Sequence, residues 1–113
     1  MSLLHETGDS RLEAKGAVLS VTGGVDFEGA AELADAGSRW LAQQATASAV
    51  VFDLNGVDRI SSAAISVVLE WLRVARAQRL TVQSVELSAP LYRLAEVVGI
   101  ERLLPARTAA ARG

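Results

Sequence analysis

The stretch of sequence that decides the fold is VVFDLNGVDRISSAAISVVLEWLRVARAQR, residues 50–79. It begins with the apolar run 50–54, which contains β-branched and aromatic residues and is followed by the turn signal Asn55-Gly56. This pattern predicts a strand that is buried on both faces of a sheet. A short loop, residues 56–61, then leads to a helical pattern that begins near Ser62. Such a strand, loop and helix N-terminus form a unit with which α/β proteins often present a site.

The helical pattern divides into two faces at about 100° per residue. The face expected to pack on the sheet carries Ala64, Val67, Val68, Trp71 and Ala75. The outward face carries Ser62, Ser66, Glu70, Arg73 and Arg76, with Ile65 and Leu69 beside the two serines. Two branched apolar residues next to two hydroxyls predict a small contact surface. The alternative is that neighbouring elements partly cover these residues, or that they are ordinary exposed apolar residues.

Composition limits the class of protein. The chain has 113 residues, 50% of them hydrophobic, and a formal net charge of −2, values that predict one globular domain. No basic stripe offers a footprint for nucleic acid. The absence of cysteine excludes disulfides, thiolate catalysis and cysteine-ligated metals. Neither a signal peptide nor an apolar run of about 20 residues is visible, so we expect a cytoplasmic location.

The flanking sequence predicts the other elements. In order, we expect a flexible start (residues 1–10), two strands that turn at Gly16 (11–15 and 17–22), a helix (27–44), the strand and helix described above, a strand (80–87), a helix up to Gly99, a closing strand or packed segment (100–104) and a flexible tail (106–113). Asp26 and Ser88 stand at helix-cap positions. This order predicts a single α/β domain over residues 11–105, a small mixed β-sheet with helices packed on one face.

Groups suited to catalysis are few. The only histidine, His5, lies in the expected flexible start, which separates it from every serine of the core. No Gly-x-Ser-x-Gly elbow and no phosphate-binding loop occur. Asp26, Asp53 and Asp58 lack the spacing of metal ligands and are interpreted as caps of helices and turns. We therefore expect neither catalysis nor a cofactor.

Ser61 and Ser62 are the remaining polar feature of the key turn, and they allow two interpretations. One is helix capping, in which a serine hydroxyl accepts a hydrogen bond from a free amide of the first turn. The other is phosphorylation, since the helix dipole favours negative charge at this position. A phosphate on Ser62 would place about −1.5 to −2 charges beside Ile65 and Leu69 and would weaken an apolar docking contact.

The run 50–78, followed by a strand and by APLYRLAEVVGIERLLP at residues 89–105, resembles the STAS domain of anti-sigma-factor antagonists and related proteins. The resemblance covers about residues 14–105. In that family, a hydroxyl residue after an aspartate opens the helix that partners recognise, and it is phosphorylated in the switching members. The resemblance places the aspartate at Ser61, the hydroxyl at Ser62 and the following glycine at Ala63 or Ala64. Val25-Asp26 resembles the loop beside the same binding face.

This chain departs from the family pattern at Ser61 and at the alanines that follow Ser62. It lacks the aspartate that supports phosphorylation, but it keeps the hydroxyl of Ser62 and the helix face. This combination is typical of a fixed adaptor. The tail LYRLAEVVGIERLLP, residues 91–105, is most similar to the MlaB type of STAS domain, a subunit of an ABC transporter for phospholipids.

The resemblance therefore implies a non-enzymatic binding module whose partner is the transporter's MlaF-like ATPase. The docking face it implies consists of Ser62, Ile65, Ser66, Leu69 and Arg73, with Val25 and Asp26 at the rim. One alternative is an anti-sigma-factor antagonist that binds an anti-sigma-factor kinase and is regulated by phosphorylation of Ser62. A third class, binding of a small ligand or lipid by the protein itself, requires a cavity.

Overall fold

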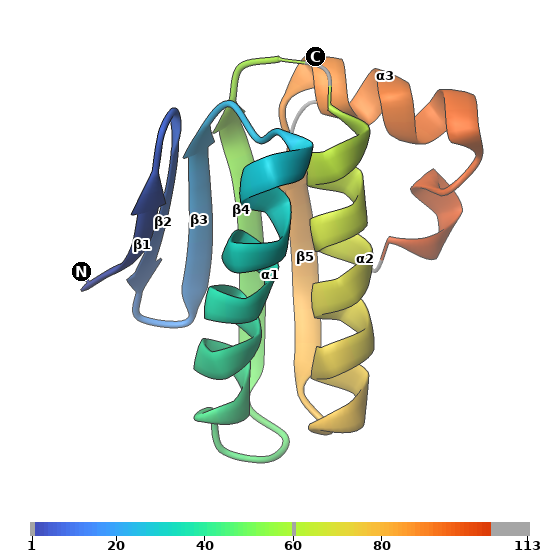
Figure 1. Cartoon of the computed structure of the whole chain (residues 1–113). Helices are drawn as coiled ribbons and strands as arrows, with labels where there is room; N and C mark the ends of the chain where they lie inside the picture. Colours follow the sequence, from blue (N-terminus) through green and yellow to red (C-terminus); the bar gives the residue numbers. More distant parts are fainter. Residues whose placement is uncertain (1, 60, 105–113) are drawn as a thin grey trace.

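Five strands form one mixed sheet in the order β1-β2-β3-β4-β5 in a computed structural model that describes residues 2–59 and 61–104 (Figure 1). The elements are β1 (Ser2–Thr7), β2 (Ser10–Lys15), β3 (Val18–Gly23), α1 (Phe27–Ala42), β4 (Ala49–Val57), α2 (Ser62–Ala77), β5 (Thr81–Leu87), α3 (Ala89–Val98) and the 3-10 helix η1 (Glu101–Leu103). The first three strands pair antiparallel, whereas β3, β4 and β5 pair parallel. The predicted α/β fold class with a small mixed sheet is confirmed.

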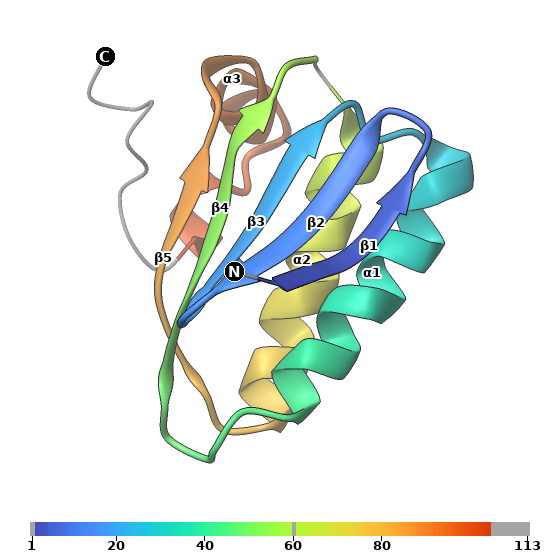
Figure 2. The same ribbon diagram turned by 90° about the vertical axis from the view of Figure 1, so that its left-hand side faces the viewer.

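The helices cover one face of the sheet, so that each strand alternates between core and open face. Figure 2 shows the strands on one side of the molecule and α1 and α2 together on the other. Along β4, Val50, Phe52 and Leu54 are buried beneath the helices, while Val51 and Asp53 are partly exposed. The prediction that this strand is buried on both faces is therefore wrong, because no helix covers the second face among the described residues.

The expected flexible start forms a strand instead. Residues 2–7 make β1, which pairs antiparallel with β2 at the edge of the sheet, and His5 lies within it. The register shifts between Leu3 and His5, so Leu4 breaks the alternation of apolar and polar residues by which a strand is recognised in a sequence. The predicted tail at residues 106–113 lies outside the described residues.

The turn predicted at Asn55-Gly56 is also wrong, because β4 continues to Val57. The ladder between β3 and β4 is irregular at this point, with one extra residue in β4 between two pairs of partners. The Asp53 carboxylate accepts hydrogen bonds from the backbone N and the Nδ2 of Asn55, at 3.0 and 3.1 Å. The turn signal thus marks a local bulge within the strand, not its end.

The helix boundaries agree with the sequence to within two residues. Asp26 caps α1 by accepting a hydrogen bond of 2.8 Å from the backbone N of Gly29, and α2 begins at Ser62 as predicted. The cap of α3 differs from the prediction, because Ser88 stands at the cap position without a side-chain cap bond. The segment 100–104 forms η1 and buries Leu104.

The two central helices pack against each other through Trp71, whose indole lies against Gly37. Trp71 of α2 is fully buried, and its Nε1 donates a hydrogen bond of 3.1 Å to the carbonyl of Ala34 in α1. The Trp71 ring also lies against Phe52, with centroids 5.6 Å apart. A Cβ at Gly37 would lie 2.4 Å from atoms of the indole ring. The indole therefore occupies the space that any side chain at position 37 would need.

We predict that Gly37→Ala lowers the free energy of unfolding by about 1–3 kcal/mol, because the added methyl group must displace a buried ring. Intrinsic helix propensity alone would give the opposite sign, a gain of about 1 kcal/mol. Urea denaturation of the two proteins separates these effects. A more stable variant would contradict the close contact at Gly37.

Candidate protein-docking site

The predicted docking face begins at the end of the sheet where the parallel strands β3 and β4 lead into α1 and α2, and it continues along α2 to Arg73. Figure 1 shows the N-termini of both helices at this end. Three connections meet there: the β1–β2 turn at residues 8–9, the β3–α1 loop at residues 24–26 and the β4–α2 loop that ends at Ser61. Loops at the carboxyl ends of parallel strands are where α/β folds most often place binding groups.

Ser61 joins two of these connections. Its Oγ donates a hydrogen bond of 2.6 Å to the carbonyl of Val25 and accepts one of 3.1 Å from the backbone N of Ala64. The capping interpretation is thus confirmed for Ser61, the residue at the position of the family's aspartate. The bond to Val25 was not foreseen, because it links residues 36 positions apart in the sequence. One hydroxyl therefore caps α2 and fixes the loop before α1.

Arg59, in the β4–α2 loop, contacts both the β1–β2 turn and the β3–α1 loop. Its Nη2 lies 3.1 Å from a carboxylate oxygen of Asp9, and its Nε lies 3.8 Å from Asp58. The guanidinium covers Gly24, where a Cβ would lie 1.9 Å from Nη2. At Gly23, φ is +88° and a Cβ would overlap the carbonyl oxygen of Asp9, so this position requires glycine. Because these charges are exposed, the ion pairs position the loops more than they stabilise the fold.

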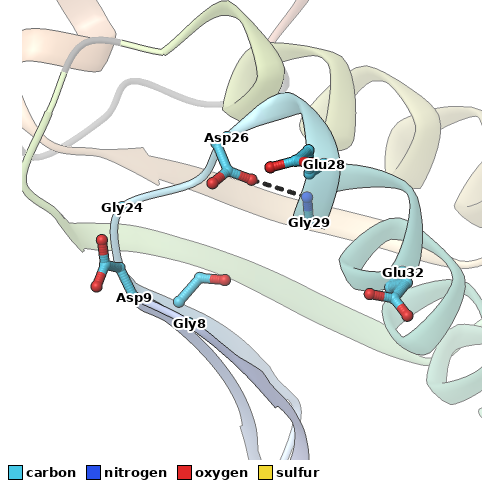
Figure 3. Close-up of a pocket in the computed structure, with 8 residues that line it drawn as sticks. Gly8, Asp9, Gly24, Asp26, Glu28, Gly29 and Glu32 are labelled. Atoms are coloured by element: carbon cyan, nitrogen blue, oxygen red, sulfur yellow. Dashed lines mark hydrogen bonds between the residues drawn. The ribbon is translucent and has the colours of Figure 1, made fainter.

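A polar pocket of about 340 Å³ separates the β1–β2 turn from the first turns of α1 (Figure 3). Its lining includes Gly8, Asp9, Ser10, Gly24, Asp26, Glu28, Gly29 and Glu32. Within the described part of the chain, no three acidic or histidine side chains are arranged to hold a metal ion. Asp26 serves as the cap of α1, as predicted, and its exposed carboxylate forms part of an acidic rim beside the docking face.

Four of the predicted residues on α2 point outward. Ser62 and Ser66 are exposed, and the Oγ of Ser66 donates a hydrogen bond of 3.1 Å to the carbonyl of Ser62. Leu69 is 38% exposed. Arg73 is exposed and forms two hydrogen bonds to Glu70, at 3.0 and 2.6 Å. These bonds, with a smaller contribution from the charge of Arg73, hold the pKa of Glu70 below its ordinary value.

Two predicted residues do not belong to the outer surface. Ile65 is only 6% exposed and is part of the core, so the prediction that it faces outward is wrong. The helical wheel assumed one covered side, whereas α2 contacts both α1 and α3, as well as the sheet strand β5. The buried side of α2 is therefore wider than the helical wheel predicted, and it includes Ile65. The side chain of Val25 is also 6% exposed, and this residue contributes its carbonyl to the rim instead.

α1 also contributes to this surface, which was not predicted from the sequence. Phe27 is 76% exposed and lies at one end of a shallow groove of about 280 Å³ between α1 and α2. The groove is lined by Phe27, Ala30, Ala31, Ala34, Ser66 and Val67. Phe27, Ala31 and Ala34 follow one another at helical spacing, and this was the available sign of a second apolar stripe on α1. Ser66 connects this groove with the predicted face on α2.

Comparison with known proteins defines the class of this site. Residues 9–105 match the family model described as "Mlab, STAS domain". The chain belongs to the STAS family. The resemblance inferred from the sequence, including its MlaB type, is therefore confirmed, and STAS domains are in general modules that bind other proteins. The sequence has no significant match among curated proteins. None of the helices in residues 2–59 and 61–104 has the length and apolar character needed to cross a bilayer.

We predict that Ser61→Ala lowers the free energy of unfolding by about 1–2 kcal/mol, because the STAS domain loses a helix cap and leaves the Val25 carbonyl without this donor. Hydrogen exchange at the amide of Ala64 should accelerate as well. Ser66→Ala is the matched control, since it removes an exposed serine of the same helix and should change stability by less than about 0.5 kcal/mol. Equal effects of the two substitutions would contradict the linking role of Ser61.

Proposed function

We propose that this STAS domain is a non-enzymatic, MlaB-like subunit that binds and supports the MlaF-like ATPase of an ABC transporter for phospholipids. In this role it contributes to the lipid asymmetry of the outer membrane. The protein would then be cytoplasmic and would reach the inner membrane only through its partner. The match of residues 9–105 to the MlaB-type STAS model supports the class of partner.

The observation that carries the proposal is the surface shared by α1 and α2. Phe27, an exposed aromatic residue, lines one groove with the exposed Ser66, and the exposed Leu69 follows Ser66 by three residues on α2, where Ser62 is exposed as well. Apolar groups with hydroxyls between them, next to the acidic rim at Asp26, have the mixed character of a protein interface with a polar edge. Large exposed aromatic residues at such a surface are frequent anchors of binding.

The position of the histidine supports a binding role for Ser62 instead of a catalytic one. His5 belongs to β1, and strands β2 and β3 separate it from β4, the strand that leads to Ser62. At about 4.8 Å between neighbouring strands, β1 and β4 lie roughly 14 Å apart. A serine nucleophile needs its base within hydrogen-bonding distance, about 3 Å.

An anti-sigma-factor antagonist regulated by phosphorylation is the second candidate function. The exposure of Ser62 at the first residue of α2 favours it, because a kinase can reach this hydroxyl and the helix dipole stabilises a phosphate there. Ser61 argues in the other direction. In place of the family's aspartate it provides a neutral hydroxyl, which is already engaged in one hydrogen bond to the β3–α1 loop and one that caps α2.

We predict that Ser62→Glu and Leu69→Asp each weaken binding to the ATPase more than about tenfold, because both place a charge in a desolvated contact. Folding should persist, since both side chains are exposed; circular dichroism and thermal unfolding check this. Val97→Asp on α3 is the matched control, because Val97 is 82% exposed and lies outside the proposed face. If Leu69→Asp unfolds the chain, Leu69 belongs to the core.

The experiment that separates the two functions is a pull-down of the tagged protein from its native cells at low salt. Mass spectrometry would identify the bound proteins and would measure phosphate on the Ser62 peptide. Recovery of an ABC ATPase with an unmodified Ser62 supports the transporter subunit. Recovery of an anti-sigma-factor kinase with phosphorylated Ser62 would overturn it in favour of the switch.

A further inference from the structure

A second groove, distinct from the one at Phe27, lies along the C-terminal half of α2. It encloses about 500 Å³ and is lined by Leu69, Leu72, Arg73, Arg76, Val82 and Leu103. Three elements contribute: α2, the beginning of β5 and η1. Leu69 and Leu103 are 38% and 63% exposed, whereas Leu72 and Val82 are partly buried against the core. An apolar floor is thus open to solvent beside two arginines.

The two arginines differ in whether an acidic side chain pairs with them. Arg73 forms a bidentate pair with Glu70, which largely neutralises its charge. None of the carboxylates whose side chains the structure describes forms an ion pair with Arg76. Among the lining residues that the structure describes, none is acidic. The groove therefore carries a positive charge that the described part of the chain does not compensate.

We propose that this groove binds an acidic segment of the protein partner. Apolar side chains of the segment would cover Leu69 and Leu103. A carboxylate of the segment would pair with Arg76, because a guanidinium group can donate two parallel hydrogen bonds to a carboxylate. The groove continues the docking face, because Leu69 and Arg73 belong to both. The inference rests on the proposed function only for the identity of the partner.

The shape of the groove favours a peptide segment over a small ligand or a lipid chain. A binding pocket for a small molecule normally buries most of the ligand surface, whereas Leu103, 63% exposed, leaves this groove open on one side. The sequence also argues against residues 105–113 as the occupant. That segment contains Arg107 and Arg112 and no aspartate or glutamate, so its side chains carry the same sign of charge as Arg76.

The test uses two synthetic peptides with identical leucine positions, one with glutamate and one with lysine at the positions between them. Each is titrated into the isotope-labelled full-length chain and followed by NMR. We expect the glutamate peptide to bind at least about tenfold more tightly than the lysine peptide and to shift the amide signals of Leu69, Arg76 and Val82. Its affinity should fall with added salt, since the contact is partly ionic.

Arg76→Glu should weaken binding of the glutamate peptide about tenfold or more and favour the lysine peptide. Arg39→Glu is the matched control, because Arg39 is exposed in the last turn of α1 as Arg76 is in the last turn of α2. Absence of a preference between the peptides, equal effects of the two substitutions, or signal shifts elsewhere would overturn the inference. So would Arg76-dependent binding to phosphatidylglycerol vesicles without a peptide preference, which would assign the groove to a lipid surface.

The same variants distinguish this inference from the proposed function. If the purified ATPase binds the wild-type chain and Arg76→Glu weakens that binding while Arg39→Glu does not, both proposals are supported. If Arg76→Glu leaves ATPase binding unchanged and the peptides show no preference, the groove inference fails and the transporter role stands. If the ATPase does not bind but the glutamate peptide does, the transporter role fails and the groove remains a site for an acidic segment.

Discussion

The contact between Trp71 and α1 is the constraint on which the rest of the structure depends. The indole fills the space above Gly37 and donates its N–H to the carbonyl of Ala34, while its ring lies against Phe52 of the sheet. A single side chain thus fixes the distance between the two helices and their height above the strands. The groove beside Phe27 lies between the same two helices, and most of its lining consists of the small side chains of Ala30, Ala31, Ala34 and Ser66.

The connections at the end of the sheet are held by polar contacts in addition to the burial of Val25. Ser61 ties the start of α2 to the carbonyl of Val25, and Arg59 ties the β1–β2 turn to the loop at Gly24. Both contacts join segments that are distant in sequence. A surface on which a partner docks gains affinity when its loops are already ordered, because less conformational entropy is lost on binding. We interpret these contacts as the means by which the docking face is preorganised.

A formal net charge of −2 conceals an uneven distribution of charge. Acidic side chains gather at the β1–β2 turn and the first turns of α1, whereas Arg73 and Arg76 flank the groove on the second half of α2. The proposed interface therefore has an acidic rim at one end and a basic groove at the other. Such a pattern orients a partner and rejects one in the wrong register, which is the main contribution of charge to protein interfaces.

The sequence by itself determined the order and type of the elements from β2 to α3, the cap Asp26, and the outward position of Ser62 and Leu69. These features depend on periodicity and on hydrogen bonds between near neighbours. Only the tertiary structure decided that Ile65 is buried, that residues 2–7 complete the sheet and that Phe27 belongs to the exposed face. Burial depends on which elements pack together, as where α3 contacts α2, and β1 escaped recognition because the register shift between Leu3 and His5 breaks its alternation.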